Sequence, residues 1–221
     1  MRDRVLATIR GLHPGYFAFV MATGIISTGM FLLGPSWLSR ALLIVTACGL
    51  VVLGVALIIR LVRFRSAVIA DVATPERAFG FFTIVAGLNV LGVSVSIAAT
   101  ILVPAWPSQS ALLAPVAGGL WCLGLLLYLM IVALILLRWL TFPMTPETLG
   151  PPYWILMGAT AISVLAGAKY LGLPAQTPVV KATAGFVEGF TFALWAFGTW
   201  WIPLLVILGL WRHLRRHWPL T

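Results

Sequence analysis

Charged side chains are scarce in this sequence: only 9% of its 221 residues are Asp, Glu, Lys or Arg, against about 25% in soluble domains. Hydrophobic residues make up 62%, and the mean hydropathy is +1.09. Continuous apolar runs recur at about 20 residues or more, the length that a helix needs to cross a bilayer core of about 30 Å. Membrane β-strands would be shorter and would alternate polar with apolar residues. The composition excludes a water-soluble globule and predicts an all-α, multi-pass membrane protein.

Acidic residues are the scarcest ionisable group, five in all, and only Glu188 falls inside an apolar run. His13, His213 and His217 stand at the ends of runs or in the tail, and the sequence contains no H-E-x-x-H, G-x-S-x-G or P-loop motif. His213 and His217 have the spacing of a two-histidine metal site, but no carboxylate or cysteine accompanies them. We therefore expect no enzymatic activity, no metal and no cofactor.

Cysteine is nearly absent as well, with two residues in the chain, Cys48 and Cys122. Both fall within apolar runs, where a cysteine behaves as a small hydrophobic side chain. We expect both to be buried, and neither to form a disulfide or a metal pair.

Six apolar runs divide the chain into three predicted helical hairpins. A basic N-terminus over 1–13 precedes a membrane domain over 14–212, and a basic tail over 213–221 follows it. The first run is too long for a signal-peptide core and more runs follow it, so it is predicted to be a span. The last run exceeds the usual span length and contains Pro203, which predicts one kinked helix. The predicted spans are 14–34, 41–61, 79–103, 111–137, 153–173 and 179–210.

The basic residues that give the chain its formal charge of +9 lie mainly in the loops and at the ends of the runs. If the N-terminus is cytoplasmic, 11 of the 14 Lys and Arg residues lie on that side, and only Arg40, Lys169 and Lys181 lie on the other. The positive-inside rule then places both termini in the cytoplasm and the protein in the cell membrane, inner or plasma. The basic excess is thus expected to set orientation and to contact anionic lipid, and no nucleic-acid partner is expected.

The odd-numbered runs share features that the even-numbered runs lack. Four residues of the first run recur at equal spacing in the fifth, and two glycines of the first recur at equal spacing in the third. Repeated hairpins are common in transporters, so we expect the odd helices to face inward and the even helices to face lipid; chance similarity between apolar helices is the alternative. The repeated residues are Phe17, Met21, Ile26 and Ser27 with Tyr153, Met157, Ile162 and Ser163, and Gly24 and Gly29 with Gly87 and Gly92.

Polar groups inside the runs are the remaining candidates for function. The amide of Asn89 could either donate to a passing anion or join two helices. Glu188 follows Lys181 by two helical turns, which favours a structural ion pair. The glycines of the odd runs either let backbones pack closely or leave a lumen, and a lumen almost without acids would suit anions better than cations.

Three segments resemble the tellurite-resistance/dicarboxylate transporter family, which also includes malate permeases, sulfite exporters and the slow anion channel of plant guard cells. They are HPGYFAFVMATGIIS (13–27), PPYWILMGATAIS (151–163) and FALWAFGTWWIPLLVILGLWRH (192–213). The resemblance implies ten helices, arranged as five hairpins in a quasi-five-fold ring, with odd helices around a pore and often three copies in the assembly. It implies transport of a small anion, either a C4-dicarboxylate such as malate or an oxyanion like tellurite or sulfite.

The resemblance also assigns pore-lining residues, to which the polar argument adds Asn89. The gating phenylalanine of the family's ninth helix has no counterpart, and with about six of ten helices the chain is expected to be C-terminally truncated. A non-transporting assembly subunit, or an inactive fragment, is the alternative function. The expected pore-lining residues are Phe17, Met21, Thr23, Gly24, Gly87, Asn89, Gly92, Trp154, Met157 and Gly158.

Overall fold

The computed structural model describes residues 2–102, 107–141, 153–173 and 177–217, and within these ranges it contains helices and no strand. Among these described residues, six helical stretches are long and apolar enough to cross a membrane, which confirms the predicted all-α membrane fold. Glu147 and residues 218–221 of the predicted tail lie outside the described residues. The elements are α1 (Arg2–Arg10), the 3-10 turn η1 (Pro14–Tyr16), α2 (Phe17–Leu33), α3 (Ser36–Arg63), α4 (Arg65–Ala73), α5 (Pro75–Gly80), α6 (Phe82–Leu102), α7 (Pro107–Thr141), α8 (Trp154–Leu171) and α9 (Pro178–His217).

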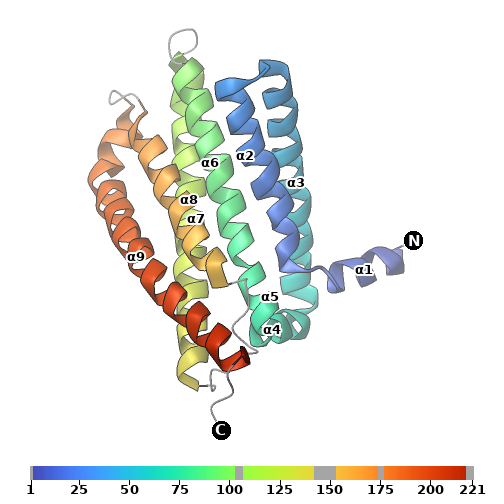
Figure 1. The fold of residues 1–221 in the computed structure, drawn as a ribbon. Coiled ribbons are helices and arrows are strands. Elements are labelled where there is room, and N and C mark those ends of the chain that lie inside the picture. The colour runs from blue at the N-terminus through green and yellow to red at the C-terminus, as the bar shows by residue number, and fades with distance from the viewer. Residues whose placement is uncertain (1, 103–106, 142–152, 174–176, 218–221) are drawn as a thin grey trace.

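The six long helices form three hairpins, with α2 packed on α3, α6 on α7, and α8 on α9. The first, third and fifth spans are α2, α6 and α8, and α6 also packs against both of the others. Figure 1 shows α3 and α9 at the two flanks and α7 behind α6 and α8. The odd-numbered spans therefore form one continuous row.

Prolines and glycine mark where several helices begin and end. Gly34 ends α2, and its N–H donates to the carbonyl of Met30; Pro35 then caps α3. Thr74 is extended because it precedes Pro75, which separates α4 from α5. Pro203 lies inside α9, which continues through it as a single tilted helix (Figure 1).

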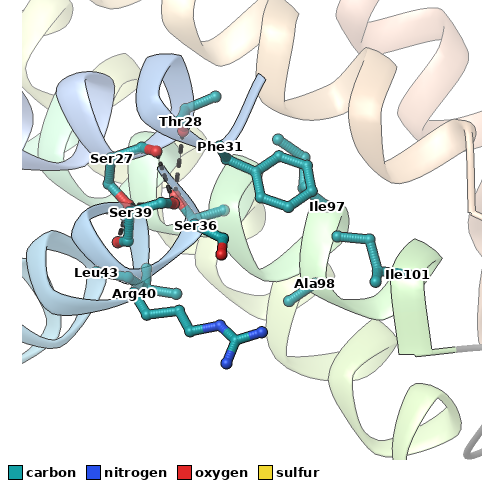
Figure 2. Close-up of a pocket in the computed structure, with 11 residues that line it drawn as sticks. Ser27, Thr28, Phe31, Ser36, Ser39, Arg40, Leu43, Ile97, Ala98 and Ile101 are labelled. Carbon is teal, nitrogen blue, oxygen red and sulfur yellow. Dashed lines mark hydrogen bonds between the residues drawn. The ribbon is translucent and has the colours of Figure 1, made fainter. Parts of the chain in front are cut away.

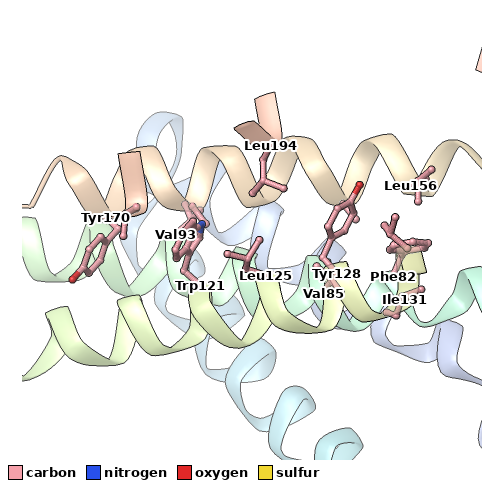
Figure 3. Packing of buried hydrophobic residues seen from close by; sticks show 14 of the residues in the cluster. Phe82, Val85, Val93, Trp121, Leu125, Tyr128, Ile131, Leu156, Tyr170 and Leu194 are labelled. Atoms are coloured by element: carbon pink, nitrogen blue, oxygen red, sulfur yellow. The ribbon is translucent and has the colours of Figure 1, made fainter. Parts of the chain in front are cut away.

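The central helix is α6. In the most apolar 18-residue stretch of its span, Arg77–Ile101, 67% of the residues are buried, compared with 6% in α3. The main core lies where α6, α7, α8 and α9 meet, around the fully buried side chains of Phe82, Trp121, Tyr128 and Leu156 (Figure 3). A smaller cluster around Phe17 joins α2 to α6. The three hairpins are thus held together mainly through α6.

The predicted burial of the two cysteines is wrong. Cys48 on α3 and Cys122 on α7 are both exposed. Lipid tails are as apolar as a helix interface, so an apolar run does not tell which of its faces is packed and which meets lipid.

The start of α1 and the end of α9 both lie at the end of the bundle that carries α4 and α5 (Figure 1). We call this the basic end and define it by Arg10, Arg60, Arg63, Arg77 and Arg138, which stand at or near the ends of helices there. The opposite end carries Arg40 at the start of α3.

Candidate functional site

An open groove of about 730 Å³ runs between α2, α6 and α8, the three odd-numbered spans. Met21 and Ile25 line it from α2, and Phe82 and Ala86 line it from α6. The α8 side carries Trp154, Ile155, Gly158, Ala159, Ala161, Ile162 and Leu165. Every described residue of the lining is uncharged, so the groove offers neither a fixed cation nor a carboxylate.

Three of the ten expected pore-lining residues lie on this groove: Met21, Trp154 and Gly158. A Cβ atom on Gly158 would meet nothing within 4 Å. This glycine therefore leaves open space on the groove, and its place on a pathway stays a prediction.

Four others lie in contacts between helices. Phe17 is 1% exposed and belongs to the cluster with Ile84 and Leu88 of α6. Met157 is partly buried against the main core. Thr23 donates to the carbonyl of Phe19 at 2.8 Å and accepts from Thr46 of α3 at 3.0 Å. Gly24 lies so close to Val90 of α6 that a Cβ atom would not fit.

The glycines of α6 face their neighbours in the same way. A Cβ on Gly87 would lie 3.3 Å from Cγ1 of Val20, and one on Gly92 would lie 3.6 Å from the carbonyl oxygen of Ala117. Of the two explanations for glycine in the odd spans, close packing applies at Gly24 and Gly87, whereas a Cβ on Gly92 would make only an ordinary contact and one on Gly158 would meet open space.

Asn89 lies in the interior rather than on the groove. Its side chain is 0% exposed, and Nδ2 donates to the carbonyl of Val85 at 2.9 Å and to Oγ of Ser163 on α8 at 3.0 Å. Trp121 of α7 donates to the carbonyl of Ser163 at 3.0 Å. Because both amide hydrogens are used within the fold, the geometry favours the alternative role, a polar link between helices.

The other eight residues of the groove lining were not predicted from the sequence: Ile25, Phe82, Ala86, Ile155, Ala159, Ala161, Ile162 and Leu165. Helical spacing was the available signal, since Ile25 follows Met21 by four residues and Ile162 follows Gly158 by four. In a helix that is apolar on every side, the same spacing fits several faces equally well. Predicting these residues would have required knowing which face of α8 is turned toward α2.

A cavity of about 430 Å³ lies between α2, α3 and α6 at the end opposite the basic end (Figure 2). Ser27 and Ser39 each donate to the other's carbonyl at 2.8 Å, and Thr28 and Ser94 donate to carbonyls of their own helices. These hydroxyl hydrogens are engaged in the fold. Arg40 also lines the cavity, and the described residues contain no ion-pair partner for it.

At the basic end, one buried carboxylate lies between two guanidinium groups. Asp71 of α4 pairs with Arg60 of α3 at 2.5 Å and with Arg77 of α5 at 2.7 Å, and the side chains of Arg60 and Asp71 are 1% and 4% exposed. Burial raises the pKa of Asp71, but the hydrogen bonds and charges of Arg60 and Arg77 outweigh it, so the pKa lies below its ordinary value of 3.8. Arg60 also donates to the carbonyl of Arg10 at 3.0 Å, which attaches α1 to α3.

The expected ion pair between Lys181 and Glu188 is not among the ion pairs of the described residues. Both residues lie on exposed positions of α9. Within the described ranges, no group of three or more His, Cys, Asp or Glu side chains is placed to hold a metal ion.

A row of three apolar helices, backed by partner helices and open along an uncharged groove, defines a multi-pass membrane protein with a candidate pathway. The family described as voltage-dependent anion channel matches residues 11–116 and 93–220, which together take in nearly the whole sequence. The chain belongs to this family, in agreement with the resemblance seen in its sequence segments.

Individual relatives agree with a membrane protein. The chain is 45% identical over 94 residues to an uncharacterized membrane protein of Mycobacterium tuberculosis, covering 42% of this chain and 47% of the relative, so it spans about half the length of that protein. It is 24% identical over 271 residues to an uncharacterized transporter of Methanocaldococcus jannaschii, covering 93% of this chain and 76% of the relative. No solved structure matches the chain closely enough to count as a relative.

The archaeal alignment also shows where the lengths differ. It is 271 positions long but takes in 93% of this 221-residue chain, or about 206 residues, so about 65 positions of the archaeal protein have no counterpart here. These positions lie inside the alignment, so part of the length difference from this relative is internal, whereas the family resemblance predicted missing helices after residue 221.

Proposed function

We propose that the chain carries small anions across a membrane along the groove between α2, α6 and α8. The observation that carries the proposal is that these three spans share one open groove with an uncharged lining. Rings of carboxylates select cations, so a lining without acids favours anions. Membership of an anion-channel family supports the same direction.

The substrate is proposed from the same lining. Malate and other C4-dicarboxylates are one candidate class, and sulfite-like or tellurite-like oxyanions are the other. The cost of removing an ion from water rises steeply with its charge, and the groove provides no guanidinium or ammonium group to offset it. We therefore favour singly charged anions, such as hydrogen sulfite, over the malate dianion.

Arg40 is proposed to assist by attracting anions to its end of the bundle. It lies in the cavity opposite the basic end, where only Arg40, Lys169 and Lys181 carry positive charge in the sequence. A cation beside a cavity with mostly apolar walls raises the local concentration of anions. The positive-inside rule assigns this end to the outside, with both termini in the cytoplasm and the protein in the inner or plasma membrane.

Assembly without transport is the second candidate function, and the exposed aromatic side chains of α9 favour it. Phe186, Phe192, Trp195 and Trp200 of this helix are each more than half exposed. Aromatic side chains on an apolar face are typical of contacts with another membrane helix or with the lipid interface. A homotrimer, as the family resemblance implies, is the proposed assembly.

Anion flux into liposomes that contain the full chain tests the proposal. Chloride, nitrate, sulfite and malate serve as probes, with protein-free liposomes as the baseline. Gly158→Leu fills the open space on the groove and is expected to lower the flux at least tenfold. Gly29→Leu is the matched control, because Gly29 on α2 also has nothing within 4 Å of a Cβ atom but does not line the groove.

Four results decide the question. Flux that falls only in Gly158→Leu supports the groove as the pathway, and faster hydrogen sulfite than malate supports the substrate proposal. Equal flux in both variants would place the pathway elsewhere. Flux of no probe above the baseline, with the protein folded, would favour assembly without transport.

A further inference from the structure

An apolar crevice of about 280 Å³ lies between α3 and α7, next to the basic end. Leu61 of α3, Val72 of α4, Phe81, and Met130 and Leu134 of α7 are among the residues that line it. Every lining side chain is apolar except Arg138 of α7. The crevice is separate from the groove of the proposed pathway, with which it shares no lining residue.

The mouth of the crevice faces outward from the bundle. Leu61, Met130 and Leu134 at its rim are 44%, 52% and 40% exposed. These residues belong to the second and fourth spans, so the opening meets lipid in the leaflet at the basic end. An apolar space open to lipid is filled by apolar groups, because among the described lining residues only Arg138 has a polar side chain that could hold water.

Positive charge borders the crevice where it meets α4. Arg138 donates to the carbonyl of Ala73 at the end of α4, and Arg77, which follows on α5, keeps 40% of its side chain exposed while it pairs with Asp71. In sequence, Arg60, Arg63, Arg65, Arg77 and Arg138 stand against three acids of the neighbouring segments, Asp71, Glu76 and Glu147. The corner therefore carries a net positive charge beside an apolar space.

We propose that this crevice binds an anionic phospholipid, with one acyl chain between α3 and α7 and the phosphate against Arg138 and Arg77. Basic pockets between membrane helices on the cytoplasmic side are typical sites for anionic lipid head groups. An acyl chain is favoured over a helix of another protein because the apolar space opens to lipid beside a positively charged corner, which matches an acyl chain joined to an anionic head group. The site does not depend on the proposed transport.

Lipid retention in native mass spectrometry tests the proposal with the purified full chain. The protein is titrated with phosphatidylglycerol or with phosphatidylcholine of the same acyl chains. Phosphatidylglycerol is expected to be retained about fivefold more strongly than phosphatidylcholine, which is the effect of one basic residue on the binding of an anionic lipid. Arg138→Gln is expected to remove this preference. Arg63→Gln is the matched control, because Arg63 is an exposed arginine of the same end that does not line the crevice.

A second variant tests the acyl-chain site without changing charge. Val72→Phe fills the crevice and is expected to lower the retention of both lipids at least threefold. Val62→Phe, at an exposed α3 position outside the crevice, is expected to leave retention unchanged. Equal retention of the two lipids, an equal loss in Arg63→Gln and Arg138→Gln, or full retention in Val72→Phe would each overturn the proposal. The Val72→Phe result stands even if Arg138→Gln fails to fold.

Discussion

The side-chain nitrogen of Asn89 on α6 lies 2.5 Å from the position that a Cβ atom would take on Gly124 of α7. No side chain other than hydrogen fits at residue 124 while the amide keeps its hydrogen bonds to Val85 and Ser163. The glycine of one even span thus provides room for the polar link of an odd span. This contact joins α6 and α7 at the centre of the bundle.

Replacing Gly124 by alanine is expected to destabilise the protein by about 1–3 kcal/mol, the usual cost of inserting a methyl group into a packed interior. The amide cannot move away without losing one of its bonds, since it is fully buried. Thermal unfolding in detergent measures the loss. Gly119→Ala on the same helix is the control: a Cβ there meets nothing within 4 Å, so its stability should be unchanged or slightly higher. Equal melting temperatures for the two variants would contradict this packing.

The helices themselves could be predicted from the sequence, but the side of each helix that packs against its neighbours could not. Runs of apolar residues bounded by Gly34, Pro35 and Pro178 mark six spans because only helices satisfy the backbone in lipid. Asn89 could not be assigned to a lumen or to an interface, because an amide in hydrocarbon needs a partner in either case. Its partner Ser163 is 74 residues away in the chain, and no local pattern connects the two.

Removing the buried guanidinium of Arg60 is expected to destabilise the protein by about 3–5 kcal/mol, because it leaves Asp71 buried with a single partner. Arg60→Gln and Arg63→Gln remove the same charge from the same helix. Arg63 is exposed, so its replacement should change stability by less than about 0.5 kcal/mol. Unfolding in denaturant compares the two, and similar losses would show that the effect comes from surface charge rather than from the ion pair.

The pH dependence of this pair follows from the lowered pKa of Asp71. Since the folded state holds the carboxylate ionised more strongly than the unfolded chain, the pair stabilises the fold above the ordinary value of 3.8, and its contribution is lost as the pH falls through the lowered pKa. The melting temperature of Asp71→Asn should therefore lie below that of the wild type by a constant amount between pH 7 and pH 5. Below about pH 3.8 the gap should narrow as Asp71 takes up its proton. A gap that narrows already near neutral pH would contradict the lowered pKa.

The candidate groove was predictable only in part, and for a specific reason. The family resemblance assigned Met21, Trp154 and Gly158 to the pathway, and these three lie on the groove. Ile25 and Leu165 face the same space but are ordinary apolar residues, equally suited to lipid and to protein. The buried pair of Arg60 and Asp71 was missed because α4 and α5 are short and lie between spans. Counting the charges of such a segment predicts its side of the membrane but not which side chains touch.

Lys181 and Glu188 are expected to show no energetic coupling, although their spacing on one helix suggested an ion pair. Two helical turns separate them, both are exposed, and the ion pairs of the described residues do not include them. A double-mutant cycle of Lys181→Gln and Glu188→Gln, followed by unfolding in detergent, should give a coupling energy below about 0.3 kcal/mol, within the range of independent sites. The matched cycle of Arg60→Gln and Asp71→Asn should couple by more than 1 kcal/mol, because these two side chains touch and are buried. A coupling in the first cycle as large as in the second would restore the ion pair on α9 and would require its side chains to turn toward each other in the detergent-solubilised protein.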